Sequence, residues 1–486
     1  MNQVLFLFSL YVYGVVFGLL FKRHLPAVLI AITGFLWGTL FWVVGGMIAL
    51  ATSLPYTPGS MISYFIVLMI GFGIIHARNN TWALSRREIT WILSIASTFL
   101  LVLFLASRYN FSAVSSDSII QIVTGRRIAY EGFSTAIIEE LSKRDAFLSL
   151  LQSASVFLGD DYICTAQPVF AFTFVLLFNY LGYQIVSQII SNKRLTLTLT
   201  ALSGIVLFST YFIIYQSFYI HNNLISAMYL FAAVSMFWLA RIESNDHWMI
   251  FGMLSLLGFS LARTEAPIFA LIFLALVISA GHIPYRLRLV SMIPYLLFLG
   301  LWYSYLLARM GEGTKILDPE KTLAIIGALI AIGLLVLVSE LNWIKRFLLP
   351  QLPKLMVVIL LIMLAFLIYQ KPEHIKDSIL ATLINMMSSG RWGITWLMFS
   401  LYLALSLAGP KVPWEEIFFY GIVSFFCLIL AIVFFRKPYH TAWGDSGNRM
   451  LTHILPISIL YVLMKTVQSL PKSTNIESKR DSSRNL

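Results

Sequence analysis

The sequence predicts an all-α, polytopic membrane protein, and composition and periodicity both lead to this fold class. The 486 residues are 59% hydrophobic and only 12% charged, whereas a soluble domain carries roughly 25% charged residues. The mean hydropathy is +0.83. Apolar runs of roughly 17–25 residues, long enough to cross a bilayer, recur along the chain. Helices are expected because they satisfy their own backbone hydrogen bonds in lipid.

About fifteen apolar runs qualify as membrane-crossing helices by length and polarity. The first is followed, not preceded, by the basic residues Lys22 and Arg23. We therefore expect it to be retained as a span with its N-terminus outside, and not removed as a signal peptide. The expected runs are 3–21, 26–52, 60–76, 90–106, 168–190, 196–218, 223–240, 248–262, 266–281, 289–308, 322–339, 355–370, 393–409, 415–435 and 450–465.

Basic residues predict the orientation of these spans. If the N-terminus lies outside, the loops with Lys22 and Arg23, with Arg286 and Arg288, and with Lys411 all lie inside. This is the arrangement that the positive-inside rule requires. The loop after the fourth span then faces away from the cytoplasm.

We expect transmembrane helices over 1–86 and over 87–464, the second range with the outer loop 107–167. The segment 465–486 is polar and rich in serine, so we expect a disordered cytoplasmic tail.

Composition also argues against several function classes. The formal charge of +12 does not indicate nucleic-acid binding, because the basic residues lie between apolar runs, where lipid headgroups account for them. The two cysteines, Cys164 and Cys427, have neither disulfide-framework nor metal-site spacing. Residues 195–240 contain no Asp, Glu, Lys or Arg. An ion-coupled transporter is disfavoured, since such proteins keep ionisable groups near the midplane.

The outer loop begins with an isolated acid, Asp117, in the stretch "SSDSIIQIVTGRRIAYEGF". Ile119, Ile120, Val123 and Ile128 share one helical face, and "STAIIEELSKRDAFLSLLQSASVFL" repeats the pattern at greater length. We expect amphipathic helices that lie in the membrane interface. Asp117 then has two interpretations, a helix N-cap shared with Ser116 or a catalytic base.

Three other polar groups interrupt apolar runs at the same predicted outer surface. Arg263 and Glu265 lie in "SLARTEAPIFALIF", and Arg391 precedes Trp392 in "MMSSGRWGITWLMF". Snorkelling side chains or an interfacial aromatic belt would account for each alone. The third group, in "RKPYHTAWGDSGNRMLTHILPISIL", consists of Asp445, Arg449 and His453.

The order of these features resembles the GT-C superfamily, the polytopic glycosyltransferases that use polyprenyl-phosphate-linked sugars. Asp117 stands where the family has an acid shortly after a span, at the head of the first outer loop. "LARTEAP" is similar to the family's "LTRPEG", and "GNRMLTHILPI" to "DRYLLPLYP". The resemblance covers most of the chain from Arg87 onward and rests on the order of the motifs.

The resemblance implies a role for each of these residues. Asp117 would be the general base, and Arg263 and Arg449 would bind the donor phosphate. Acceptor or sugar binding would fall to Glu265, Asp445 and His453.

The sequence departs from the family pattern at two positions. Many members have a second acid beside the first, but Ser116 and Ser118 flank Asp117 here; "AQPVF" replaces a His-Pro-Pro-like stretch. Asp160 and Asp161 could supply the second carboxylate, although a loop turn is the more usual explanation of such a pair. A divalent metal, Mg²⁺ or Mn²⁺, is therefore an open expectation.

The expected activity is inverting transfer of a sugar from a polyprenyl phosphate to an acceptor hydroxyl. The acceptor would be a glycan, a lipid or a protein, and the site would face the non-cytoplasmic side of a bacterial inner or plasma membrane. Two alternatives stay open: an outer-leaflet polysaccharide polymerase or ligase, and a lipid or glycan flippase without chemistry.

Overall fold

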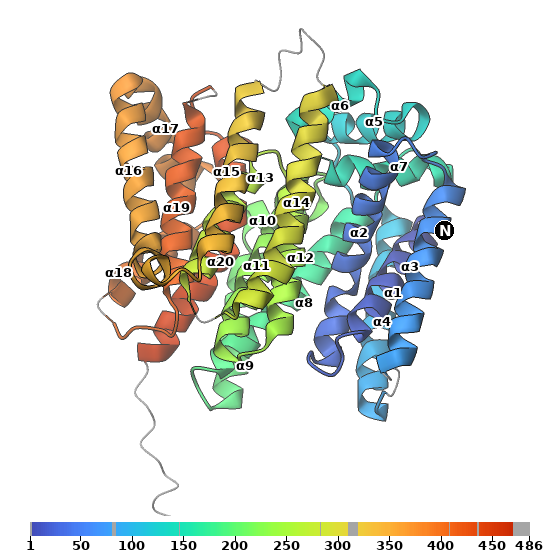
Figure 1. Ribbon diagram of the computed structural model, residues 1–486, viewed down its shortest axis with the longest axis horizontal. Helices are drawn as coiled ribbons and strands as arrows, with labels where there is room; N and C mark the ends of the chain where they lie inside the picture. Colours follow the sequence, from blue (N-terminus) through green and yellow to red (C-terminus); the bar gives the residue numbers. More distant parts are fainter. Residues whose placement is uncertain are drawn as a thin grey trace, which may run out of the picture.

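The computed structural model describes residues 2–79, 84–144, 146–281, 283–309, 319–407, 409–434 and 437–469, and they form twenty α-helices (Figure 1). Ten helices are long and apolar enough to cross a membrane, or eleven if one bent pair counts as a single span. The chain is therefore an all-helical, multi-pass membrane protein. Each of the fifteen expected runs falls on a helix, but several are short, so the count of fifteen spans stays a prediction.

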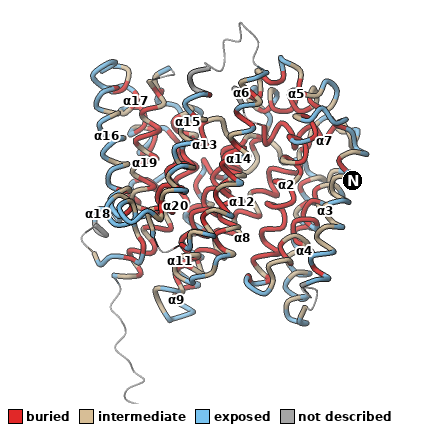
Figure 2. The backbone as a smooth tube through the Cα atoms, viewed as in Figure 1, coloured by how far each residue is buried: buried red, intermediate tan, exposed pale blue. Residues whose placement is uncertain are grey.

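Four N-terminal helices pack beside the rest of the bundle. α1 and α2 are in the closest contact, because Gly38 lets the two backbones meet: a Cβ there would lie 1.8 Å from the Leu10 carbonyl oxygen. α3 and α4 leave most of their apolar side chains exposed (Figure 2), as expected of a lipid-facing edge. Their bounds are α1 (Asn2–Leu19), α2 (Ala27–Ala51), α3 (Pro58–Asn79) and α4 (Arg86–Tyr109).

The outer loop folds into three helices at one end of the bundle (Figure 1), α5 (Ser116–Glu131), α6 (Thr135–Arg144) and α7 (Phe147–Leu158). The single long second helix of the sequence prediction is thus divided into α6 and α7. α5 packs on α7 through small and polar side chains: Ser149 donates to Gln121 at 2.5 Å. Gly125 permits this approach, since a Cβ would lie 2.5 Å from the Ser149 carbonyl oxygen.

The predicted apolar face of α5 packs against the protein only in part, since its Ile128 is fully buried. Ile119 and Val123 are exposed, whereas Ser118, Gln121 and Gly125 are buried. The face of α5 that packs on α7 carries small residues such as Gly125, because the two helices approach closely there. Whether the outer face lies in the membrane interface stays a prediction.

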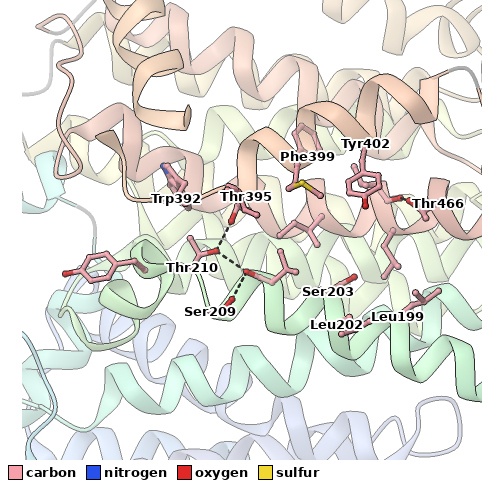
Figure 3. Close-up of a pocket in the computed structure, with 18 residues that line it drawn as sticks. Leu199, Leu202, Ser203, Ser209, Thr210, Trp392, Thr395, Phe399, Tyr402 and Thr466 are labelled. Carbon is pink, nitrogen blue, oxygen red and sulfur yellow. Dashed lines mark hydrogen bonds between the residues drawn. The ribbon is translucent and has the colours of Figure 1, made fainter. Parts of the chain in front are cut away.

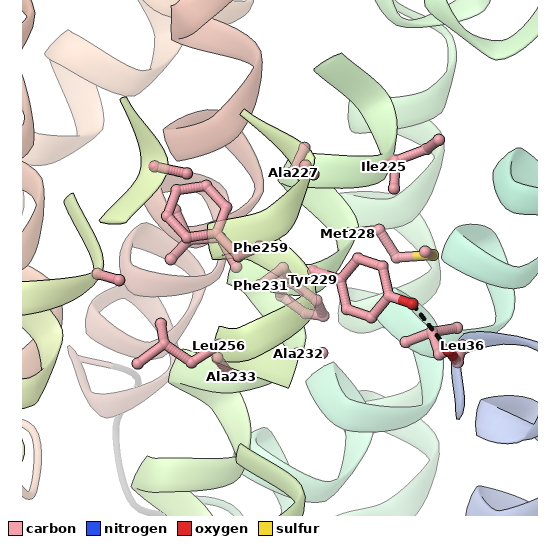
Figure 4. Packing of buried hydrophobic residues seen from close by; sticks show 14 of the residues in the cluster. Leu36, Ile225, Ala227, Met228, Tyr229, Phe231, Ala232, Ala233, Leu256 and Phe259 are labelled. Atoms are coloured by element: carbon pink, nitrogen blue, oxygen red, sulfur yellow. Dashed lines mark hydrogen bonds between the residues drawn. The ribbon is translucent and has the colours of Figure 1, made fainter. Parts of the chain in front are cut away.

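The core is arranged around α11, which is wholly buried. Its Tyr229 packs against the neighbouring helices and donates to the Leu36 carbonyl oxygen at 2.7 Å (Figure 4). α9 and α10 are bent by 72° at the break between them. The helices here are α8 (Ala166–Ser187), α9 (Lys193–Phe208), α10 (Tyr211–Phe218), α11 (Asn222–Ile242), α12 (Asp246–Ala262) and α13 (Ala266–Ser279).

The last helices complete the bundle, and α20 runs along α11. α20 continues to Ser469, so the first five residues of the predicted tail are helical; the remainder, 470–486, lies outside the described residues. The elements are α14 (Tyr285–Arg309), α15 (Pro319–Val338), the π-helix η1 (Ile344–Leu348), the 3-10 helix η2 (Leu349–Gln351), α16 (Leu352–Gln370), α17 (Pro372–Ile384), the π-helix η3 (Asn385–Ser389), α18 (Thr395–Leu407), α19 (Glu416–Val433) and α20 (Ser446–Ser469).

Candidate functional site

An ion pair joins the N-terminal ends of α5 and α20. Arg449 Nη1 donates to Asp117 Oδ2 at 2.5 Å, between residues 332 positions apart in the sequence. The Arg449 and Asp117 side chains are 21% and 24% exposed. The pair is therefore partly withdrawn from water yet accessible to a ligand.

The start of α5 explains where Asp117 lies. The N-cap is Ser115, whose hydroxyl forms a hydrogen bond with the Tyr219 hydroxyl at 2.7 Å. Asp117 lies in the first turn, so the interpretation of Asp117 or Ser116 as the N-cap is wrong. A carboxylate in a first turn is stabilised by the helix dipole, and Arg449 adds to this. Both effects favour an ionised Asp117.

Tyr219 and His221 flank the carboxylate between α10 and α11. His221 Nε2 lies 4.0 Å from Asp117 Oδ2. The rings of Tyr219 and His221 stack with their centroids 5.4 Å apart. Burial raises the pKa of the Tyr219 phenol above its usual value, and the nearby Asp117 acts in the same direction. Tyr219 is therefore a protonated hydroxyl at neutral pH.

A second charged group lies where α12 ends and α13 begins. Arg263 Nη2 donates to Glu265 Oε1 at 3.1 Å, and its Nη1 donates to Asn223 Oδ1 at 2.5 Å. His453 lines a small cavity with Arg263 and Glu265, and it interacts electrostatically with both and with His221. This network connects the second group to the Asp117–Arg449 pair.

His453 and Arg449 both retain unused hydrogen-bonding capacity. They are four residues apart on α20, which puts them on one face of the helix. Within the described parts of the chain, the Nε2 of His453 and the Nε of Arg449 are buried without a hydrogen-bond partner. Unsatisfied buried groups are uncommon and often accompany a ligand site.

Asp160 and Asp161 lie elsewhere. Both carbonyl oxygens accept from Arg126 Nη1, at 3.2 and 2.8 Å, and the Asp161 carboxylate lies 3.6 Å from the same guanidinium. Arg126 is nine residues beyond Asp117 on α5, about 14 Å along the helix axis at 1.5 Å per residue. The structure thus places the proposed second carboxylates away from the first.

Asp445 serves the start of α20. Its carboxylate accepts from the backbone amides of His440 and Gly447, at 3.2 and 2.8 Å. These are capping contacts, which fix the helix end that carries Arg449. A role in sugar binding would require Asp445 to give up this arrangement.

The residues near Asp117 do not fit a divalent metal. In the searched part of the structure, no group of three or more His, Cys, Asp or Glu side chains could hold one. The Asp117 oxygen closest to His221 already carries the Arg449 guanidinium. We therefore assign no step to a metal.

The sequence prediction missed His221, Asn223 and Tyr219. They belong to the polar stretch "YIHNN", which interrupts residues 195–240, a segment without Asp, Glu, Lys or Arg. Asn223 is fully buried. The polar triplet 221–223, which includes the first two residues of α11, was the signal that could have identified this part of the site.

An apolar groove of about 710 Å³ lies beside this region (Figure 3). It runs from Tyr211 and Trp392 at one end to Tyr402 and Thr466 at the other. The lining residues are Leu199, Leu202, Ser203, Val206, Ser209, Thr210, Tyr211, Trp392, Gly393, Ile394, Thr395, Met398, Phe399, Tyr402, Ile459, Val462, Leu463 and Thr466.

Comparisons with known proteins add no relative. No protein-family model matches the chain, and neither a curated protein nor a solved structure matches it.

Proposed function

We propose that this chain is a membrane glycosyltransferase of the GT-C type. It would transfer a sugar from a polyprenyl-phosphate donor to an acceptor hydroxyl on the non-cytoplasmic side of a bacterial inner or plasma membrane. The observation that carries the proposal is the 2.5 Å contact between Asp117 and Arg449. This contact joins two residues, the acid and one of the arginines, that the sequence alone had already selected.

Asp117 is suited to general-base chemistry. The first turn of α5 and the Arg449 guanidinium both favour its ionised form at neutral pH. In the reaction, Asp117 takes the proton of the acceptor hydroxyl while that oxygen bonds to the anomeric carbon. The bond from the anomeric carbon to the phosphate oxygen breaks at the same time, and its electron pair leaves with the lipid phosphate. Attack from the opposite face inverts the anomeric centre.

Arg449 and Arg263 are suited to the leaving phosphate. A guanidinium offers a planar set of donors that matches phosphate, and preorganised cations stabilise charge that develops in the transition state. Arg449 has an unpartnered buried Nε within the described structure. Arg263 is held by Asn223 and Glu265, which orient it without neutralising the whole group.

Glu265 and His453 would then contribute to sugar recognition. Glu265 and His453 are both buried, and they lie beside Arg263 in a space too small for a water molecule, so a sugar would have to displace side chains to reach them. A carboxylate and an imidazole at this position could accept or donate hydrogen bonds to sugar hydroxyls.

Release of polyprenyl phosphate tests the proposal. Purified protein in nanodiscs would be incubated with a panel of polyprenyl-phosphate sugars and a membrane extract that contains acceptors. A transferase releases polyprenyl phosphate in step with loss of the sugar-bearing donor, and Asp117→Asn does not. A flippase would move the lipid across the bilayer without cleaving it. A polymerase or ligase would consume a different donor and leave the lipid monophosphate sugars intact.

A further inference from the structure

Three tyrosines form a ladder that leads away from the Asp117–Arg449 pair. Tyr211, Tyr215 and Tyr219 are spaced by four residues along and just beyond α10, so they share one face. The Tyr215 and Tyr219 ring centroids are 5.1 Å apart. Tyr215 interacts electrostatically with Asp117 and Arg449. The ladder therefore begins at the proposed reaction centre.

The far end of the ladder holds a cation at the mouth of the apolar groove. Arg391 lies 5.0 Å from the Tyr211 ring and 4.8 Å from the Trp443 ring, and it donates to the Tyr211 hydroxyl at 3.0 Å. Tyr211 and Trp392 line the groove. Trp443 also packs edge-on against Tyr215, 4.7 Å away. The groove, Arg391 and the ladder are thus continuous.

The backbone at Arg391 supports a role beyond packing. Its φ is +59°, in the left-handed region that non-glycine residues rarely adopt. Such strain persists where the surroundings hold it and often accompanies ligand sites. Arg391 is nevertheless exposed, so its guanidinium is both oriented and accessible.

The length of the ladder distinguishes two kinds of lipid. Eight residues of helix separate Tyr211 from Tyr219, about 12 Å at 1.5 Å per residue. A donor has its phosphate bonded to the reacting carbon, so its phosphate must lie next to Asp117. A lipid whose phosphate is bound by Arg391 has that phosphate at the Tyr211 end of the ladder and not beside Asp117, so this position fits an acceptor better than the donor.

We propose that the groove and ladder bind the acceptor, and that the acceptor is a phosphate-bearing lipid with a short saccharide headgroup. This inference rests on the proposed transferase function. The chain of the lipid fills the groove, Arg391 binds its phosphate, and the saccharide lies over the tyrosine rings. The terminal hydroxyl then reaches Asp117, gives up its proton and bonds to the donor's anomeric carbon. The acceptor's own phosphate bond stays intact.

Photolabelling of the full-length protein in phosphatidylcholine nanodiscs tests this assignment. One probe is a polyprenyl pyrophosphate disaccharide and the other a polyprenyl phosphate monosaccharide, each with a diazirine in the lipid chain. We expect the disaccharide probe to label 199–206 and 398–402. Arg391→Gln and Tyr215→Ala should each reduce that labelling about tenfold, and Tyr215→Phe should not. Labelling by the monosaccharide probe should not depend on Arg391.

Controls separate this inference from general effects. Lys371 also lies over an aromatic ring, 4.4 Å from Phe434, but does not line the groove, so Lys371→Gln should leave labelling unchanged. Ser203→Phe fills the groove without touching Arg391 and should abolish labelling even if Arg391→Gln folds poorly. Asp117→Asn should abolish transfer but keep labelling, which distinguishes a failed transferase proposal from a failed acceptor site.

Three results would overturn the assignment. The first is Arg391-dependent labelling of the groove by the monosaccharide probe, which would make the groove a donor site. The second is an equal loss of labelling in Lys371→Gln, which would reduce Arg391 to a general surface charge. The third is absence of groove labelling by the disaccharide probe in the parent protein.

Discussion

The two ends of α20 each carry an ion pair, and the pairs differ in what surrounds them. At the outer end, Arg449 meets Asp117 from α5, with both side chains more than a fifth exposed. At the other end, Lys465 meets Glu415, which immediately precedes α19, at 3.1 Å, and the Lys465 side chain is only 3% exposed. Lys465 also donates to the Pro410 carbonyl oxygen at 2.9 Å.

The difference indicates that the Arg449–Asp117 pair can serve as a ligand site, whereas the Lys465–Glu415 pair stabilises the fold. The buried Lys465 ammonium donates to the Pro410 carbonyl oxygen and to the Glu415 carboxylate. These two bonds hold the segment before α19 against α20. Arg449 keeps a buried Nε that no described residue accepts, and Tyr219, His221 and Asp117 gather around it. An ion pair that is partly exposed and incompletely satisfied can exchange a partner for a substrate. A buried and satisfied pair contributes only to packing.

The largest effect is expected for Asp117→Asn. Loss of a general base should lower the transfer rate by roughly 10²–10⁴-fold. The unfolding midpoint should fall only modestly, because the ion pair with Arg449 and the first-turn charge are lost but asparagine can still accept a hydrogen bond from the guanidinium. The assay is sugar transfer in nanodiscs, with thermal unfolding measured on the same preparation. Asp445→Asn is the control: asparagine keeps one acceptor oxygen, enough to cap α20 at the Gly447 amide, although the bond from the His440 amide is lost, so its activity should stay near normal. Equal losses in both variants would remove the base role.

Lys465→Met should produce the opposite pattern. Removing one partner of a buried ion pair costs roughly 3–5 kcal/mol, so the unfolding midpoint should fall by several degrees. The transfer rate of the protein that remains folded should be unchanged. The double variant Lys465→Met with Glu415→Gln should recover much of the stability, because no buried charge is then left alone. A selective loss of transfer would show that the inner pair also takes part in function.

Substitutions at Arg449 should show whether its positive charge or the planar shape of its guanidinium matters for donor binding. Arg449→Gln removes the cation beside Asp117 and should raise the donor KM strongly, since a hydrogen bond to a charged group contributes roughly 1.5–3 kcal/mol. Arg449→Lys should recover only part of this loss, because an ammonium cannot reproduce the guanidinium's planar donor set. Titrating the donor against the parent, Arg449→Gln and Arg449→Lys gives the three KM values, which should rise in the order parent, lysine variant, glutamine variant. Full recovery by lysine would mean that Arg449 acts only as a point charge.

The smallest effect is expected for Tyr219→Phe. It removes the hydrogen bond with Ser115, worth roughly 1 kcal/mol, so the rate should fall only several-fold. The raised pKa of Tyr219 keeps the phenol protonated, so its contribution is complete below its unfolded pKa of about 10 and is lost as pH rises toward the folded value. Parent and variant should therefore show parallel pH–rate profiles between about pH 6 and 9. A change in shape would assign a titrating role to Tyr219.

Much of the fold could be predicted, because the bilayer imposes strict rules on apolar runs. The all-helical, multi-pass architecture and the helical outer loop follow from run length and periodicity. The packing face of α5 could not be predicted: its inner side is set by Gly125 and Gln121 against Ser149. This depends on a tertiary contact that hydrophobic periodicity does not encode.

Three residues of the candidate site could be selected from the sequence, but their contacts could not. The sequence selected Asp117, Arg449 and Arg263 because charges in an apolar chain stand out. It gave no information that Asp117 and Arg449 are in contact across 332 residues. Tyr219 and His221 are not among the Asp, Glu, Lys and Arg residues that stand out in an apolar chain. They join the site only because α10 and α11 bring them to α5.

A double-mutant cycle between Asp117 and Arg449 tests the central claim most directly. The transfer rates of the parent, Asp117→Asn, Arg449→Gln and the double variant would be measured in one preparation, with unfolding midpoints recorded for each. If the pair acts as one unit, removing the second member adds little, and the double variant should be within a few-fold of the slower single variant. If the two losses multiply, Asp117 and Arg449 act independently, and the claim that their contact forms the working centre would be contradicted.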